Sequence, residues 1–250
     1  DVVIVGNAVR RDNPEAVETE RLGLPRLSMP EALARFFLAD RQPLVVAGTH
    51  GKTTTSAMAA KVWSDCGRDP GFLIGGVPID LGVSFRCGSG PRFVIEGDEY
   101  NAAYFDRGAK FLHYRPETLI LTSVEHDHAD LYPTPESLLA AYSRLIALVP
   151  ESGLIVACGD SAEIRQLAEA ARAPVVFYGE HATNAVRLLG VPAADSAGVR
   201  FRLREESGDE LAVTMPVWGV HNVVNALAVW AAGRRGGIEA GELAGALARF

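Results

Sequence analysis

The chain has 250 residues, which is enough for one large domain or two modest ones. Hydrophobic residues make up 48% and charged residues 22%, as in an ordinary globular protein, and the apolar runs are too short to span a bilayer. The net charge of -7 argues against a nucleic-acid-binding surface, so we expect neither nucleic acid nor a membrane as a partner. The three widely spaced cysteines favour a reducing compartment, and we expect a cytoplasmic protein.

The first 43 residues predict a strand at residues 2–5, then a polar loop around Asn13 and Pro14. A helix is expected at residues 30–39, with Ser28 as its N-cap and Glu31 as the capping-box partner. Residues 40–43 are typical of a linker, so we place a domain boundary between residues 1–40 and 41–250. Both chain ends look cut, and we expect a piece of a longer protein.

From residue 44 onward, strand and helix patterns alternate, which predicts an α/β fold. The strand segments are nearly continuous apolar runs, as in parallel strands that helices cover on both faces. The predicted strands are residues 44–47, 92–95, 118–122, 154–157 and 174–178. The predicted helices are residues 53–66, 135–149 and 161–171. An antiparallel hairpin at residues 199–215 and helices at residues 221–235 and 240–249 complete the pattern.

The first motif is the run GTHGKTTT at residues 48–55, which follows a short apolar strand and opens a helix. Gly48 and Gly51 let the backbone amides approach phosphate oxygens. Lys52 would supply a cation to the β- and γ-phosphates of a nucleotide, and Thr53 a hydroxyl to Mg²⁺. The general phosphate-loop pattern has a glycine where Val46 stands, so an ordinary strand–turn–helix is the alternative interpretation.

Acidic residues follow the next two strands, where ligands of open parallel sheets bind. Glu96, Asp98 and Glu99 would repel one another unless a cation lies among them, and Mg²⁺ suits such oxygen ligands. Residues 125–130, with the sequence EHDHAD, repeat this arrangement and include His128. No nearby Cys or further His completes a zinc site. Solvated acidic turns and structural histidines are the alternatives.

The last motif is HNVVN at residues 221–225, where a helix begins. Asn222 and Asn225 are three residues apart and therefore share one face of the first helical turn. Each amide could cap the helix or could pair with the edge of a nucleotide base, and the sequence leaves both possibilities open.

Taken in order, these motifs resemble the Mur ligase superfamily over nearly the whole chain. The resemblance implies a P-loop NTPase-like central domain at residues 41–250, preceded at residues 1–40 by the end of a UDP-sugar-binding, Rossmann-like domain. The C-terminal domain of the family, with its expected peptide site, is absent from this sequence. There are departures: Gly97 stands where the family has Ala, Asn101 where an acid is usual, and Ser123 where Asn is usual.

The resemblance implies an ATP- and Mg²⁺-dependent ligase that forms an amide bond through an acyl phosphate. It assigns catalysis to Lys52, Glu96 and His128, and Mg²⁺ binding to Thr53, Glu96 and His128. The nucleotide-binding residues that it implies are Gly48, Thr49, His50, Gly51, Lys52, Thr53, Thr54, His221, Asn222 and Asn225. Several family members carry a carbamylated lysine at a second metal, but residues 135–149 contain no Lys.

Within the superfamily, residues 69–78 and 98–116 resemble the branch that joins L-Ala-γ-D-Glu-meso-diaminopimelate, the murein tripeptide, to UDP-N-acetylmuramate. The branch that adds L-alanine to the same acceptor is the nearest alternative. A phosphate-loop kinase or GTPase is more distant, since the sequence has no Asn-Lys-x-Asp motif. A stable ATP-binding fragment without turnover is the non-enzymatic alternative.

Overall fold

The computed structural model describes residues 1–127 and 131–250. Its α-helices are α1 (Pro14–Arg21), α2 (Met29–Leu33), α3 (Lys52–Asp65), α4 (Pro135–Ala147), α5 (Ala162–Ala168), α6 (Val220–Arg235) and α7 (Ala240–Leu247). A π-helical segment, η1, spans Ala34–Leu38, and a 3-10 helix, η2, spans Lys110–His113. Within residues 1–127 and 131–250, no helix is both long enough and apolar enough to cross a membrane.

The strands nearest the N-terminus are β1 (Val3–Val5), β2 (Arg26–Ser28), β3 (Gln42–Ala47), β4 (Gly71–Leu73), β5 (Phe85–Arg86), β6 (Arg92–Gly97), β7 (Asn101–Ala103) and β8 (Asp106–Ala109). They are followed by β9 (Thr118–Leu121), β10 (Leu154–Cys158), β11 (Val175–Gly179), β12 (Val186–Asp195), β13 (Gly198–Arg204) and β14 (Glu210–Met215). The structure therefore confirms the α/β alternation and the five strands predicted from residue 44 onward. The short pairs β4–β5 and β7–β8 carried no clear period-two pattern and were not predicted.

Within the described residues, a 10-stranded sheet runs in the order β14-β13-β12-β11-β10-β9-β3-β6-β4-β5. Neighbouring strands from β12 to β4 are parallel. The predicted hairpin is β13–β14, and it extends this sheet because β13 pairs with β12 in antiparallel fashion. Helices α3, α4 and α5 follow the parallel strands β3, β9 and β10.

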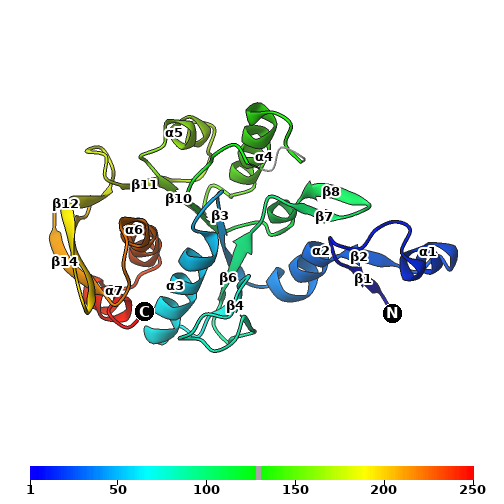
Figure 1. Ribbon diagram of the computed structural model, residues 1–250, viewed down its shortest axis with the longest axis horizontal. Coiled ribbons are helices and arrows are strands. Elements are labelled where there is room, and N and C mark those ends of the chain that lie inside the picture. Colours follow the sequence, from blue (N-terminus) through cyan, green and yellow to red (C-terminus); the bar gives the residue numbers. More distant parts are fainter. Residues whose placement is uncertain (128–130) are drawn as a thin grey trace.

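Strand β3 lies inside the sheet and is buried on both faces. Leu44 and Val46 pack into the core that α3, α6 and α7 cover, while Val45 and Ala47 pack into the core beneath α4 and η2. All four side chains are 0% exposed. Figure 1 shows α3, α6 and α7 together on one side of the strands, with α4 and α5 on the other. This two-sided burial explains why the run is apolar throughout rather than alternating.

The first 38 residues form an arm beside the sheet (Figure 1), with β1 paired in parallel to β2. Residues around Asn13 and Pro14 were expected to form a loop, but α1 begins there. The Asn13 side chain accepts hydrogen bonds from the amides of Glu15 and Ala16, and Pro14 occupies the first helical turn. Helix start signals were therefore present, although α1 buries few apolar residues.

The helix expected at residues 30–39 begins as predicted. The Ser28 side chain accepts from the Glu31 amide, and the Glu31 carboxylate accepts from the Ser28 amide, which is the predicted capping box. Its second half winds as the π-helical segment η1 instead of continuing as an α-helix. Gln42 and Pro43, expected in a linker, already belong to β3.

Candidate active site

Three strands of the sheet end side by side at its carboxyl edge. Ala47, the last residue of β3, pairs with Gly97 of β6 on one side and with Leu121 of β9 on the other. The loops that carry the first three sequence motifs leave the sheet from these positions. The tertiary fold therefore brings residues 48–53, 96–99 and 122–127 to one place, as expected for a ligand site in an open parallel sheet.

The loop after β3 has the backbone that its glycines allow. Gly48 has φ +140°, and a Cβ atom there would lie 2.1 Å from the Thr122 hydroxyl oxygen. Gly51 has φ +80° and directly precedes α3, where a Cβ atom would lie 2.9 Å from the Asn225 amide oxygen. Side chains at either position would clash, and both conformations are rarely accessible to other residues. The amino end of α3 therefore stands open, with its free amides at this edge.

Hydrogen bonds tie this loop to the one after β9. The Thr49 amide donates to the Ser123 carbonyl (2.9 Å), and the His50 amide donates to the Ser123 hydroxyl oxygen (2.9 Å). The Thr122 hydroxyl donates to the His50 carbonyl (2.6 Å), and the Glu125 amide donates to the Thr49 hydroxyl oxygen (2.9 Å). These contacts hold the loop open without help from a ligand.

Lys52 forms the most buried ion pair of the site. Its Nζ lies 3.1 Å from Oε2 and 3.3 Å from Oε1 of Glu99, and it also donates to the Gly48 carbonyl at 2.6 Å. The Lys52 side chain is 13% exposed and that of Glu99 only 2%. The sequence placed Glu99 in an acidic group without identifying it as the counter-ion of Lys52. This contact depends on the β3–β6 register, which the sequence does not reveal.

Thr53 and Glu96 meet beside the amino end of α3. The Thr53 hydroxyl donates to Oε1 of Glu96 at 2.5 Å, and the Gly75 amide donates to the other carboxylate oxygen. A hydroxyl and a carboxylate at such short range are oxygen ligands of the kind that Mg²⁺ takes alongside phosphate oxygens. The residue pair therefore fits a magnesium ion, and Gly75, which the sequence did not single out, orients the carboxylate.

Two of the acidic residues around the end of β6 have a lysine partner each, which the sequence did not predict. Asp98 pairs with Lys110 at 3.1 Å, and Glu99 pairs with Lys52, so each carboxylate has its own positive partner. Among the residues described, no three His, Cys, Asp or Glu side chains lie close enough to hold a metal. The two lysines therefore relieve repulsion between these carboxylates.

Tyr132 closes one side of this cluster and was not predicted to belong to it. Its hydroxyl donates to the backbone carbonyl of Glu99 at 2.7 Å. Burial, together with the Glu99 charge, raises the pKa of Tyr132 above its ordinary value, so the hydroxyl keeps its proton and remains a donor. His126 contacts the Tyr132 carbonyl through Nε2 at 2.9 Å. His128, assigned to metal binding from the sequence, lies outside the described residues.

The fourth motif reaches the site through one residue. Asn225 is buried in α6 and faces Gly51, whereas the Asn222 side chain donates through Nδ2 to the Trp218 carbonyl at 2.7 Å just before the helix. His221 is exposed on the first turn. Asn225 therefore lies beside the phosphate loop, and Asn222 makes a local contact at the helix start.

Similarity to known proteins shows which family the chain belongs to. The family model described as the Mur ligase middle domain matches residues 46–233. The chain belongs to the Mur ligase family. It is 38% identical over 251 residues to the UDP-N-acetylmuramate–L-alanyl-γ-D-glutamyl-meso-2,6-diaminoheptandioate ligase of Escherichia coli strain K12, covering 100% of this chain and 54% of that one.

Two further Mur ligases are about equally similar. The UDP-N-acetylmuramate–L-alanine ligase of Renibacterium salmoninarum is 39% identical over 254 residues, covering 100% of this chain and 52% of the relative. A solved ligase from Neisseria meningitides, described as acting on UDP-N-acetylmuramate and L-alanyl-γ-D-glutamyl-meso-diaminopimelate, matches with TM-score 0.91 and 37% identity over 100% of this chain and 78% of that one. The chain thus spans about half the length of the Escherichia coli and Renibacterium ligases.

The structure accounts for two departures from the Mur ligase pattern. At Gly97, a Cβ atom would lie 2.7 Å from Cγ1 of Val45 and 3.2 Å from Cβ of Phe111, so the packing of this chain leaves no room for the usual Ala. Ser123 replaces Asn, yet its hydroxyl oxygen still accepts a hydrogen bond from the His50 amide. Both substitutions are accommodated without opening the site.

Proposed function

We propose that this chain is the ATP-binding part of a ligase that joins a peptide to UDP-N-acetylmuramate. ATP would phosphorylate the lactyl carboxylate of the sugar nucleotide, and the free amine of the incoming peptide would displace phosphate to form the amide bond. The observation that carries this proposal is the convergence of Lys52, Thr53 and Glu96 at the open amino end of α3. It supports phosphoryl transfer because such reactions depend mainly on positioning and charge neutralisation.

The proposed roles follow from where the side chains lie. The amides of residues 48–53 and the Lys52 ammonium would hold the β- and γ-phosphates, and Thr54 lies on the same first helical turn. In the structure without nucleotide, the Lys52 ammonium contacts Glu99 and the carbonyls of two loop residues. On nucleotide binding, phosphate oxygens would replace some of these contacts, and the ammonium would turn toward them. Asn225, beside Gly51, would contact the nucleotide from α6, with His221 or Asn222 assisting.

Magnesium is part of the proposal. Thr53 and Glu96 would hold the ion, which would neutralise phosphate charge during transfer. His128 together with Glu96 would hold a second Mg²⁺ near the acyl phosphate. His50, which lies 3.7 Å from the Glu125 carboxylate at the rim, would contact the carboxylate of the sugar.

For the incoming group we propose the tripeptide L-Ala-γ-D-Glu-meso-diaminopimelate, and a cytoplasmic role in cell-wall peptide recycling. Support comes from residues 69–78 and 98–116, which resemble the tripeptide branch and include Gly75 and Lys110. The alternative is L-alanine, favoured by the equally similar Renibacterium ligase.

We also propose that residues 1–40 end the UDP-sugar-binding domain and that residues 41–250 form the central domain.

The decisive experiment measures phosphate release by the full-length protein with ATP, Mg²⁺ and UDP-N-acetylmuramate. Tripeptide and L-alanine are supplied in separate reactions, and only the true nucleophile should stimulate release. Lys52→Ala should abolish the stimulated rate, because the phosphate charge would go uncompensated. If neither the tripeptide nor L-alanine stimulates phosphate release, the ligase assignment is wrong. Near-normal turnover of Lys52→Ala would refute the phosphate-loop role.

A further inference from the structure

Hydrogen bonds to three consecutive carbonyl groups fix the backbone at residues 98–100, just after β6. The middle carbonyl, that of Glu99, accepts from the Tyr132 hydroxyl at 2.7 Å. The two flanking carbonyls accept from amides of η2: Asp98 from Phe111 at 3.2 Å and Tyr100 from Lys110 at 2.9 Å. The Glu99 carbonyl therefore has a side chain as its donor, and this side chain comes from a different loop.

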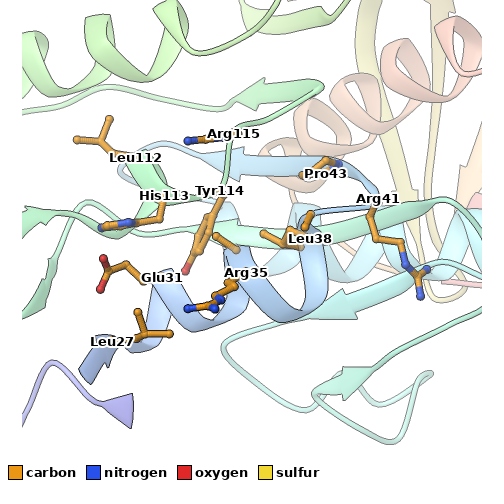
Figure 2. Close-up of a pocket in the computed structure, with 12 residues that line it drawn as sticks. Leu27, Glu31, Arg35, Leu38, Arg41, Pro43, Leu112, His113, Tyr114 and Arg115 are labelled. Atoms are coloured by element: carbon orange, nitrogen blue, oxygen red, sulfur yellow. The ribbon is translucent and has the colours of Figure 1, made fainter. Parts of the chain in front are cut away.

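The two flanking donors are held independently of Tyr132. Phe111 is 0% exposed, and its ring packs on that of Tyr142 in α4, with ring centroids 5.4 Å apart. The next three residues line a cavity whose opposite wall includes α2 and η1 (Figure 2); they are Leu112, His113 and Tyr114. Because the core and the arm both contact this segment, η2 stays in place without the Tyr132 hydroxyl.

The Glu99 side chain carries the effect of the Tyr132 hydrogen bond to Lys52. A bond to the Glu99 carbonyl restricts rotation of the adjacent peptide group, and with it the direction in which the Glu99 side chain leaves the backbone. The Glu99 carboxylate lies 3.1 Å from the Lys52 ammonium, which also donates to the Gly48 carbonyl at 2.6 Å. The Tyr132 hydroxyl is thus two contacts away from the phosphate-loop lysine.

Tyr132 belongs to the loop that carries the third sequence motif, residues 125–130. The Tyr132 carbonyl contacts Nε2 of His126 at 2.9 Å, so the tyrosine is fixed at its backbone as well as at its hydroxyl. A continuous set of contacts therefore runs from His126 through Tyr132 and Glu99 to Lys52. It joins the loop after β9 to the loop after β3.

We propose that Tyr132 is a positioning residue for Lys52, acting through Glu99. With Glu99 fixed, the ammonium lies beside the Gly48 carbonyl, at the loop that would hold the phosphates. An ammonium already held at this place needs little reorganisation when phosphate oxygens arrive. The nucleotide part of this inference rests on the proposed function, whereas the placement of Lys52 in the protein without nucleotide does not.

The first test measures how readily Lys52 reacts with acetic anhydride when no nucleotide is present. The chain has three lysines, and Lys61 is an internal reference because it lies on the same helix with 14% exposure, against 13% for Lys52. An amine reacts slowly while its hydrogen-bond acceptors hold it. Tyr132→Phe, which removes only the hydroxyl, should raise the Lys52-to-Lys61 labelling ratio at least threefold, as measured by peptide mass spectrometry below the melting temperature.

A double-mutant cycle shows whether the effect passes through Glu99. Glu99→Gln should also raise the labelling ratio, and adding Tyr132→Phe to it should produce no further rise. A full additional rise in the double variant would mean that Tyr132 acts on Lys52 by another route, and the proposal would be wrong.

Tyr178→Phe is the matched control, since the Tyr178 hydroxyl also donates to a backbone carbonyl at a strand end, that of Leu121 at 3.3 Å. This variant should leave the labelling ratio unchanged, even if it lowers the melting temperature. An equal rise in Tyr178→Phe would show general loosening of the sheet edge. That result, or an unchanged ratio in Tyr132→Phe, would overturn the proposal.

The second test is equilibrium binding of a fluorescent ATP analogue. Tyr132→Phe should weaken binding at least threefold in the unsubstituted chain and should have no further effect in the Glu99→Gln background. Equal affinity of Tyr132→Phe and the unsubstituted chain would remove Tyr132 from nucleotide binding. If the unsubstituted chain binds no analogue, the proposed function fails, while the labelling ratio still decides whether Tyr132 positions Lys52.

Discussion

The Lys52–Glu99 pair offers the sharpest test of the site's electrostatics. Lys52→Met removes the ammonium from a carboxylate whose side chain is only 2% exposed. At 3.1 Å and an effective dielectric constant of about 20, the attraction is about 5 kcal/mol before desolvation is counted. The 13% exposure of Lys52 lets water replace part of it. We therefore expect Lys52→Met to destabilise the unliganded protein by about 3 kcal/mol, in line with other broken buried pairs.

The assay is thermal and urea unfolding without nucleotide. A loss of about 3 kcal/mol in a chain of this size lowers the melting temperature by roughly 6–12 °C. Glu99→Gln in the Lys52→Met background should restore most of the stability, because no buried charge then remains, although ATP binding should stay lost. This non-additivity is the signature of a directly coupled pair.

Lys61→Met provides the matched control on the same helix. Lys61 is 14% exposed and pairs with Asp65, but Asp65 keeps Arg249 as a second partner at 2.9 Å. We expect this variant to lose less than about 1 kcal/mol. If Lys52→Met and Lys61→Met unfold alike, or if the Lys52 and Glu99 effects simply add, the buried-pair reasoning is wrong.

Three further outcomes are expected. Gly48→Ala should weaken nucleotide binding at least tenfold and lower the melting temperature, because its Cβ would lie 2.1 Å from the Thr122 hydroxyl oxygen; equilibrium binding of a fluorescent ATP analogue would detect this. Asn225→Ala should weaken binding of the same analogue while leaving stability nearly unchanged, and unaltered affinity would remove Asn225 from the site. Burial raises the pKa of the Cys158 thiol, so fewer thiolates form at pH 8, and iodoacetamide followed by peptide mass spectrometry should find exposed Cys87 alkylated first.

Local sequence determined much of the proposed nucleotide site. An apolar strand, glycines at the turn and Gly51-Lys52-Thr53 at a helix start specify a phosphate loop within about a dozen residues. The structure places β3 and α3 on either side of that loop. Because turn geometry and helix initiation depend on neighbours in the chain, such features are accessible from sequence. The Ser28–Glu31 capping box was predictable for the same reason.

Other features depended on which strands became neighbours. The Lys52–Glu99 pair, the Gly75 amide on Glu96 and the contacts of Ser123 with the phosphate loop all join segments tens of residues apart. Sheet order and register bring these groups together, and both follow from the packing of the whole core rather than from any local pattern. The sequence alone therefore determined the phosphate-loop motif and the acidic residues near it. Only the tertiary structure decided which of these groups face one another, and only the tertiary structure added Gly75 and Tyr132 to them.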